Sequence, residues 1–342
     1  MTRYDEARLE LRARPRRWLV TGVAGFIGST LLESLLELDQ TVTGLDNFAT
    51  GRRRNLDEVG SRVGADRFVR FRLVEGDVAS ESVCRDAVAG VDAVLHQAAL
   101  GSVPRSIVAP LESNAANVTG HLALLEAARQ AGVKRFVYAS SSSVYGDSPT
   151  LPKLEPELGR PLSPYAVTKL ADELYASVYG ELHAMQTVGL RYFNVFGPRQ
   201  DPEGAYAAVI PKWVAAMIRG ETVMIHGTGE TSRDFCHVAN VVQANVLAAT
   251  VASKESVNQA YNVAAGQRTS LSELFVLLRD RLVARHPRLA ALQPEHGAFR
   301  TGDVLHSLAD IGKARRLLGY EPTHTIERGL DESLAWYEQN LA

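Results

Sequence analysis

The sequence has few cysteines, little net charge and no long apolar segment. Cys84 and Cys236 are its only cysteines in 342 residues, and they lie too far apart for a CxxC motif. One such pair in a chain of this length is not a disulfide framework, and it fits a reducing cytosol. We therefore expect a cytoplasmic protein without structural disulfides.

The near-neutral charge excludes further classes of protein. Lys and Arg number 37 and Asp and Glu number 39, so the formal net charge is −2. This charge provides no field that would hold a nucleic acid or an anionic membrane surface, and any phosphate must be bound locally. No run reaches the ~18 to 20 apolar residues that cross a bilayer. We expect neither a nucleic-acid partner nor a membrane partner.

The chain does contain a regular alternation of short strands and longer helical segments. Apolar or β-branched runs at 18–20 and 41–45 alternate with segments of helical period such as 29–38. This alternation indicates βαβ units. The predicted fold class is α/β, a Rossmann-type doubly wound parallel sheet with a smaller α/β C-terminal substrate lobe. The arginine-rich segment 1–17 is predicted to be a short, solvated helical lead-in.

Loop-rich segments indicate discontinuous domains. Beyond residue 194, turn residues at 197–198, 201–204 and 227–230 separate isolated helices, whereas 238–251 and 260–263 again resemble a helix and a strand. We predict a dinucleotide-binding domain of residues 1–194 plus about 238–268, and a substrate domain of about 195–237 plus 269–342.

A glycine-rich turn follows the first predicted strand. Gly22, Gly25 and Gly28 form a GxxGxxG pattern that opens a helix. These glycines permit a tight turn, close approach of a pyrophosphate and close helix packing, with the helix N-terminus facing the negative charge. Such glycines can also make only a turn. Asp46, at the end of the second strand, strengthens the cofactor hypothesis because a carboxylate there can accept both ribose hydroxyls.

The same carboxylate selects between cofactors. A 2′-phosphate would meet the negative charge of Asp46, which favours NAD over NADP, although the three arginines at 52–54 leave NADP open. Asp77 follows another strand and can reach the adenine amino group. Ala98 and Ala99 end a further strand with small side chains that leave room for the cofactor.

The most specific pattern is a YxxxK motif formed by Tyr165 and Lys169. Residues four apart lie on one helical face, and an ammonium close to a phenol, with a positive nicotinamide nearby, favours the phenolate. Tyr165 is therefore a candidate general base. The pair alone recurs by chance on amphipathic helices. Its order after GxxGxxG, Asp46 and the serine-rich strand end at 140–146 makes chance a poor explanation.

Together these motifs, with Gly76-Asp77-Val78 and the Arg-Tyr-Phe-Asn segment at 191–194, resemble the extended short-chain dehydrogenase/reductase family over nearly the whole chain. The resemblance implies that Ser141 is the hydroxyl partner of the base. Sugar-nucleotide dehydratases of this family carry an acidic residue after that serine, whereas Ser142 and Ser143 stand here. The resemblance therefore favours oxidation and re-reduction at C4 over elimination.

Further segments resemble 4-epimerases of UDP-N-acetylglucosamine and its uronic acid, in particular Gly-Ser-Val-Pro-Arg-Ser at 101–106. Ser307 aligns with a position that limits pocket size in UDP-galactose 4-epimerases, and a serine there leaves volume for an N-acetyl group. His226 and Val223 depart from the closest pattern, where an asparagine and a tyrosine are expected near the uracil.

The implied function is NAD-dependent 4-epimerisation of UDP-N-acetylhexosamines through a transient 4-keto sugar. The resemblance also implies tightly bound, recycled NAD, a homodimer and a role in surface polysaccharide precursors. A preference for UDP-N-acetylhexosaminuronic acids or for UDP-glucose and UDP-galactose stays open. So do a dehydrogenase or reductase that releases its keto product and a non-catalytic NAD sensor.

The predicted site comprises three sets of residues and no metal ligand. The catalytic set is Tyr165, Lys169 and Ser141. The cofactor-binding set is Gly22, Gly25, Phe26, Ile27, Gly28, Asp46, Asn47, Thr50, Gly51, Asp77, Val78, Gln97, Ala98, Ala99, Tyr165, Lys169 and Val195. The substrate-binding set is Ser102, Arg105, Ser141, Ser142, Ser143, Asn194, Ala208, Val209, Lys212, Trp213, Arg233, Arg268, Arg300, Asp303 and Ser307.

Overall fold

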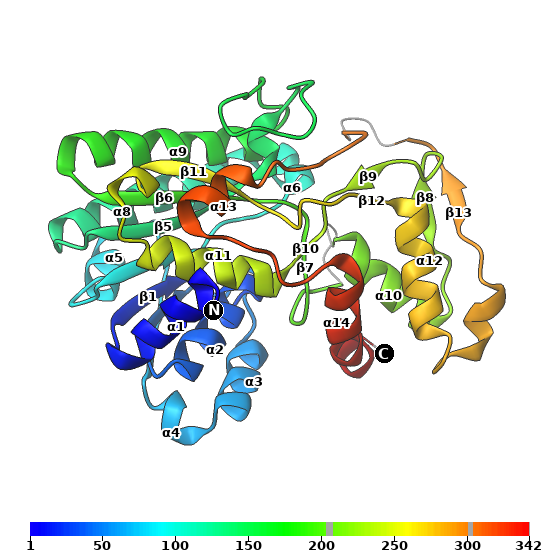
Figure 1. Cartoon of the computed structure of the whole chain (residues 1–342), viewed down its shortest axis with the longest axis horizontal. Helices are drawn as coiled ribbons and strands as arrows, with labels where there is room; N and C mark the ends of the chain where they lie inside the picture. The colour runs from blue at the N-terminus through cyan, green and yellow to red at the C-terminus, as the bar shows by residue number, and fades with distance from the viewer. Residues whose placement is uncertain (203–207, 300–303, 342) are drawn as a thin grey trace.

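The computed structural model describes residues 1–202, 208–299 and 304–341. At its centre lies a seven-stranded parallel sheet with strand order β11-β6-β5-β4-β1-β2-β3 (Figure 1). The predicted Rossmann-type sheet is thereby confirmed. Its strands are β1 (Arg17–Thr21), β2 (Thr41–Asp46), β3 (Phe71–Glu75), β4 (Ala93–His96), β5 (Arg135–Ser141), β6 (Gln186–Tyr192) and β11 (Gln259–Val263).

Helices cover both faces of the sheet because successive strand side chains point to opposite faces. Trp18 and Val20 pack in one buried cluster with the first set of helices, while Leu19 packs in another with the second set. The first set is α1 (Arg3–Ala13), α2 (Phe26–Glu37), α3 (Arg53–Val63) and α11 (Val238–Thr250). The second set is α5 (Glu81–Ala87), α8 (Gly120–Gln130) and α9 (Pro164–His183).

Helix α1 differs from the predicted solvated lead-in. It begins with a capping box at Thr2 and Asp5, but Ala7 and Leu11 are buried in the core of the sheet unit. The Gln40 side chain donates to the Leu11 carbonyl (2.9 Å). The arginines hide this docking in the sequence, because only one apolar stripe of α1 faces the core.

A second, smaller cluster lies beside the sheet unit, at the right of Figure 1. It is built by α10 (Val209–Arg219), α12 (Leu271–Leu282) and α14 (Ile326–Leu341), with β8 (Met224–His226) pairing in parallel with β13 (Glu295–Gly297). Trp213 of α10 meets Phe275 of α12 edge-on, with ring centroids 6.5 Å apart. This cluster is the smaller α/β lobe beside the sheet.

Helix α13 (Gly312–Leu318) packs with the sheet unit rather than with the second cluster. Ala314, Leu318 and Tyr320 are buried in the same cluster as β1 and α2. The domain boundaries stay a prediction, and we propose that residues 309–320 join the dinucleotide-binding domain. The apolar pattern of residues 309–320 shows that the segment is buried, but it does not show on which of the two units it packs.

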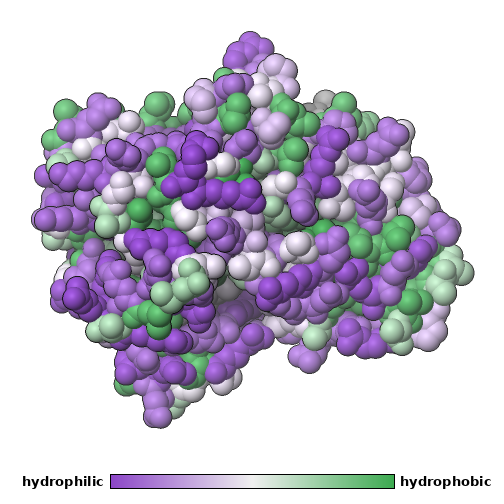
Figure 2. Space-filling model, in the orientation of Figure 1, coloured by the Kyte–Doolittle hydropathy of each residue, from purple (hydrophilic) through white to green (hydrophobic). Residues whose placement is uncertain are grey.

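The remaining elements are short. They are α4 (Ala65–Phe68), α6 (Val103–Val108), α7 (Pro110–Asn114), η1 (Ala115–Thr119), η2 (Ser142–Tyr145), β7 (Val195–Phe196), β9 (Ser232–Arg233), β10 (Cys236–His237), η3 (Lys254–Ser256), β12 (Thr269–Ser270) and η4 (Pro287–Ala291). Cys84 and Cys236 are both buried and unbonded. No helix in the described part of the chain is long and apolar enough to span a bilayer. Hydrophilic residues predominate on the face drawn in Figure 2, with apolar residues in small groups between them.

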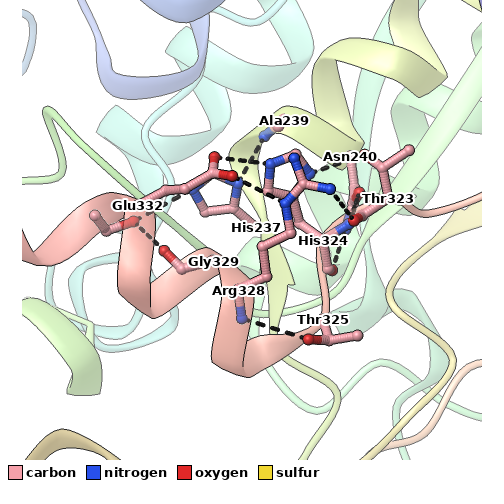
Figure 3. A network of polar contacts seen from close by, with 10 residues as sticks. His237, Ala239, Asn240, Thr323, His324, Thr325, Arg328, Gly329 and Glu332 are labelled. Atoms are coloured by element: carbon pink, nitrogen blue, oxygen red, sulfur yellow. Dashed lines mark hydrogen bonds and ion pairs between the residues drawn. The ribbon is translucent and has the colours of Figure 1, made fainter. Parts of the chain in front are cut away.

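A cluster of polar side chains ties α14 to the start of α11 (Figure 3). The His237 and His324 rings stack with centroids 4.7 Å apart, and His324 Nε2 lies 2.9 Å from a Glu332 carboxylate oxygen. Arg328 also donates to Glu332 (2.9 Å). We call these four residues the α14 clasp.

Candidate active site

The glycine-rich turn joins β1 to α2, and its glycines are required by space as well as by backbone angle. Gly22 has a φ of 65°, and a Cβ on Gly28 would lie 2.0 Å from the Gly22 carbonyl oxygen. Gly25 is the N-cap of α2 and supplies no capping side chain, and the first turn of that helix carries no acidic residue. The backbone N–H groups of this turn are therefore suited to a phosphate.

Asp46 ends β2 beside that turn. Its carboxylate accepts hydrogen bonds from the backbone N–H groups of Ala24 (2.8 Å) and Phe48 (2.8 Å). Burial raises the pKa of Asp46, while these two donors lower it. The bonds fix the carboxylate at the sheet edge and leave further lone pairs for ribose hydroxyls.

One cavity of about 420 Å³ runs along this edge, and we call it the nucleotide cavity. The structure brings fourteen predicted cofactor residues together in its lining: Gly22, Gly25, Phe26, Ile27, Gly28, Asp46, Asn47, Thr50, Gly51, Asp77, Val78, Gln97, Ala98 and Ala99. Asn47 donates to the Asp77 carboxylate (2.9 Å), which links the ends of two neighbouring strands.

A second cavity of about 420 Å³, the lobe cavity, lies at the start of α10. Its lining contains the predicted residues Asn194, Val195, Ala208, Val209, Lys212, Trp213 and Arg233. A third cavity of about 630 Å³ shares Gly25 and Phe26 with the nucleotide cavity and Ala208 with the lobe cavity. This bridging cavity therefore adjoins both of the others, and Ser102 and Arg105 are part of its lining.

The predicted catalytic residues come from β5 and α9. Ser141 ends β5, and its Oγ accepts from the Ser143 backbone N–H (3.1 Å) and the Ser143 hydroxyl (3.0 Å), which leaves its own hydrogen to donate. Tyr165 begins α9, where its backbone N–H donates to Ser106 Oγ (3.0 Å). Lys169 is buried one turn later and donates to the Ala139 carbonyl of β5 (3.0 Å).

Other predicted residues lie elsewhere. Arg268 is exposed and Ser307 half-buried, and among the described residues neither lines one of the three cavities. The Ser307 backbone N–H donates to the Ser232 carbonyl (3.0 Å), next to Arg233 in the chain. Arg300 and Asp303 lie outside the described residues.

Several cavity residues escaped sequence reasoning. Phe235, Thr231 and Met224 line the lobe cavity together with His226, and Glu112 lines the nucleotide cavity. Thr231 and Phe235 lie in the Thr-Ser-Arg-Asp-Phe segment at 231–235, which resembles the epimerases but from which only Arg233 was assigned to the site. No local motif marks Met224 or Glu112.

Asp234, beside Arg233, anchors the loops around the lobe cavity. Its buried carboxylate accepts backbone N–H groups of Ala265 (3.0 Å), Gly266 (3.2 Å) and Ala309 (3.2 Å). Burial raises the pKa of Asp234 to about 7, against the effect of these donors. The carboxylate thus joins three chain segments behind a cavity wall.

Within the described ranges, one group of side chains has the composition of a metal site: His237, His324 and Glu332, whose ligand atoms lie within 4.8 Å of one another. These three side chains belong to the α14 clasp, where they bond to one another and to neighbouring residues (Figure 3). The Ala239 N–H donates to His237 Nδ1 (3.4 Å), so the ring carries its proton on Nε2, which contacts Ser333 Oγ (3.2 Å). Both nitrogens of His237 are therefore engaged.

Comparison with known proteins places the chain in a family. Residues 18–264 match the NAD dependent epimerase/dehydratase family. The chain belongs to this family. The resemblance to extended short-chain dehydrogenases/reductases is confirmed, and NAD is the family's cofactor. The glycine cradle, the open N-terminus of α2 and Asp46 in the nucleotide cavity fit this dinucleotide.

Members of the epimerase/dehydratase family resemble the whole chain. A UDP-glucose 4-epimerase of Mycolicibacterium smegmatis is 36% identical over 323 residues, covering 94% of this chain and 98% of the relative. The structure of a UDP-N-acetylglucosamine 4-epimerase from Methanobrevibacter ruminantium, in complex with UDP-N-acetylmuramic acid, has a TM-score of 0.87 and 35% identity, covering 95% and 99% of the two chains. A UDP-glucose 4-epimerase of Thermus thermophilus in complex with NAD has a TM-score of 0.80 and 31% identity, covering 95% and 99%.

Proposed function

We propose that this protein is a UDP-hexose 4-epimerase that retains NAD and prefers UDP-N-acetylhexosamines. The observation that carries the proposal is that the bridging cavity shares lining residues with both the nucleotide cavity and the lobe cavity. In the part of the chain that the structure describes, Tyr165, Lys169 and Ser141 line none of these three cavities. However, α9 contacts α6, which contributes Arg105 to the bridging cavity, and the Tyr165 N–H donates to Ser106 Oγ of α6. Relatives whose names state UDP-hexose 4-epimerase activity support the reaction.

Two positions support the preference for acetylated sugars. By its resemblance to UDP-galactose 4-epimerases, Ser307 stands at the position that limits the size of the sugar pocket, and its backbone N–H bonds to Ser232, next to Arg233 of the lobe cavity. The likeness to a UDP-N-acetylglucosamine 4-epimerase structure supports the same choice. In this proposal Arg233 and Lys212, at the lobe cavity, meet the diphosphate, because a guanidinium or ammonium donates well to phosphate.

The chain's own residues then move one proton and hold the sugar. Tyr165 removes the proton of the C4 hydroxyl, and Ser141 donates its hydrogen to the same oxygen. When bound, NAD supplies reversible hydride acceptance at C4. Contacts at the lobe cavity keep the diphosphate anchored while the 4-keto hexose turns its other face to the cofactor. Tyr165 then returns the proton, so no net redox change occurs.

The testing experiment follows UDP-GlcNAc by NMR with purified protein and no added cofactor. Appearance of UDP-GalNAc supports both the epimerase and its retained NAD. Conversion of UDP-glucose or of UDP-GlcNAcA alone, in parallel samples, keeps the mechanism and overturns the substrate choice. Stoichiometric NADH with a released ketone would instead identify a dehydrogenase, and tight NAD binding without any turnover would identify a sensor.

The proposed enzyme is a homodimer formed through α9. That helix exposes a stripe of apolar side chains at helical spacing: Val167, Leu174, Tyr175, Val178 and Leu182. Exposed apolar residues also stand on α6 and α7, which contact α9: Ile107, Val108 and Leu111. Exposed apolar side chains gathered on neighbouring helices are typical of a protein interface.

The two cysteines of the chain, Cys84 and Cys236, are buried and unpaired. This favours a reducing, cytoplasmic location for the proposed enzyme.

A further inference from the structure

The lysine of the YxxxK motif has a partner that the motif does not include. Asp172 lies one turn after Lys169 on α9, and Lys169 Nζ is 3.1 Å from its Oδ2. The side chains of both residues are nearly inaccessible, at 3% and 1% exposure. The second carboxylate oxygen of Asp172 is buried and accepts no hydrogen bond from any residue that the structure describes. Among the described residues, the hydrogen-bond donor to the buried Asp172 carboxylate is therefore the Lys169 ammonium.

Among the described residues around Lys169, the other ionisable side chains are paired or held neutral. On the same helix Glu173 is occupied by Arg191 of β6 in a two-bond ion pair (2.8 and 2.7 Å). His121 of α8 and His96 of β4 are held neutral: burial lowers the pKa of His121 to about 3 and that of His96 well below its usual range, and the Lys169 charge lowers both further.

The neighbouring phenol adds no charge either, since burial raises the pKa of Tyr138 on β5 well above its usual range. Burial raises the pKa of Asp172 to about 6, while Lys169 lowers it. The 3.1 Å contact with Lys169 Nζ favours the ionised carboxylate, which balances the Lys169 ammonium.

We propose that Asp172 is a positioning residue for the reaction: it holds the Lys169 ammonium at the end of β5 and offsets part of its positive charge beside Tyr165. This inference rests on the proposed role of Tyr165 as base. An ammonium favours the phenolate, and a carboxylate next to that ammonium weakens the effect. Asp172 thus sets the pH at which the base becomes competent.

Replacement by asparagine separates charge from position. The amide oxygen of Asp172→Asn still accepts from Lys169, but the negative charge is lost. The acidic limb of the kcat–pH profile should move to lower pH by roughly one unit, the effect of a unit charge over the roughly 10 Å that seven residues span along a helix, at an effective dielectric constant near 20. Glu181→Gln, an exposed change of the same kind on α9, should leave the profile in place. An unshifted profile in folded, active Asp172→Asn overturns the proposal.

Ultraviolet titration of the phenolate tests the same charge without turnover. The Tyr165 signal is the difference between each protein and its Tyr165→Phe counterpart, in the wild-type and the Asp172→Asn backgrounds. We expect a lower midpoint in the Asp172→Asn background. Equal midpoints refute the inference even if no sugar nucleotide is turned over. Absence of turnover with a shifted midpoint would contradict the proposed function alone.

Replacement by alanine tests position. Asp172→Ala cannot accept from Lys169, so kcat should fall at least tenfold below that of Asp172→Asn, with KM for the sugar nucleotide little changed. Equal kcat values in the two variants would remove the positioning role. If Asp172→Ala does not fold, the Asp172→Asn profile and titration still decide whether the charge acts.

Discussion

The phenol of Tyr165 is the group on which the proposed chemistry depends. Tyr165→Phe removes the base and preserves the ring, so kcat should fall by about 100- to 10,000-fold while bound NAD is retained. Turnover by NMR and the cofactor content of the purified protein check both expectations.

A matched control lies on the same helix. The Tyr179 hydroxyl donates to Glu126 of α8 (3.1 Å) in a separate pocket formed with α5, so Tyr179→Phe should keep normal turnover. Normal turnover by Tyr165→Phe would mean that another group is the base.

The preference for acetylated sugars depends on the side chain at Ser307. Ser307→Tyr should reduce kcat/KM for UDP-GlcNAc at least about tenfold more than for UDP-glucose, because the larger ring removes volume that the N-acetyl group needs and a misfit of this size costs roughly 1–3 kcal/mol. Ser307→Ala should change neither substrate much. Equal losses on both substrates would contradict the gatekeeper assignment.

Prediction from sequence works best for residues whose contacts are local. The spacing of Tyr165 and Lys169 on one helix, and of the glycines around Gly25, depends on the chain within a few residues. Asp172 was missed because its pairing with Lys169 matters only once both are buried between α9 and the sheet. The assignment of Arg268 to the substrate stays a prediction, since its side chain is exposed and lines none of the three cavities in the described part of the chain.

At the scale of elements, the α14 clasp predicts a pH-dependent stability. Burial lowers the pKa of His237 to about 4, below the ordinary value of 6.5. Because the folded protein holds His237 neutral, its contribution to the free energy of unfolding is fully present above pH 6.5. This contribution is lost as the pH falls towards 4, by up to about 3 kcal/mol. Chemical denaturation at several pH values should record this loss.

Asparagine at His237 can still accept from the Ala239 N–H but does not titrate. His237→Asn should therefore lose less stability between pH 6.5 and 4 than the wild type does. Replacement of the exposed His183 by asparagine should leave the acid loss unchanged. If His237→Asn loses as much stability between pH 6.5 and 4 as the wild type does, another titrating group causes the loss.

Helices and strands could be predicted where the spacing of their apolar residues shows which face is buried. The strands of the sheet are short, apolar and separated by helices, and the alternation alone gives the parallel sheet. Helix α1 was misjudged because its charged residues outnumber the stripe formed by Ala7 and Leu11. Helix α13 packs on the sheet unit through Ala314 and Leu318. These two side chains could equally have been buried in the second lobe, so the sequence does not show which unit the helix joins.

For the whole molecule, the exposed stripe on α9 predicts association. Wild-type protein should have twice the monomer mass in light scattering, and Val178→Asp, which places a charge in the stripe, should have the monomer mass. Leu9→Asp on α1 makes the same change at an exposed leucine away from α9 and should stay dimeric. A monomeric wild type would contradict the dimer.

Strand β11 at the edge of the sheet has a consequence for how the protein is made. The other six strands, β1 to β6, end at Tyr192, whereas β11 begins at Gln259 and pairs only with β6. The first six strands can therefore pair on the ribosome while residues 193–258 are still being translated. That segment includes α11, which covers one face of the sheet together with α1, α2 and α3, so the sheet unit is complete only after both α11 and β11 have joined it.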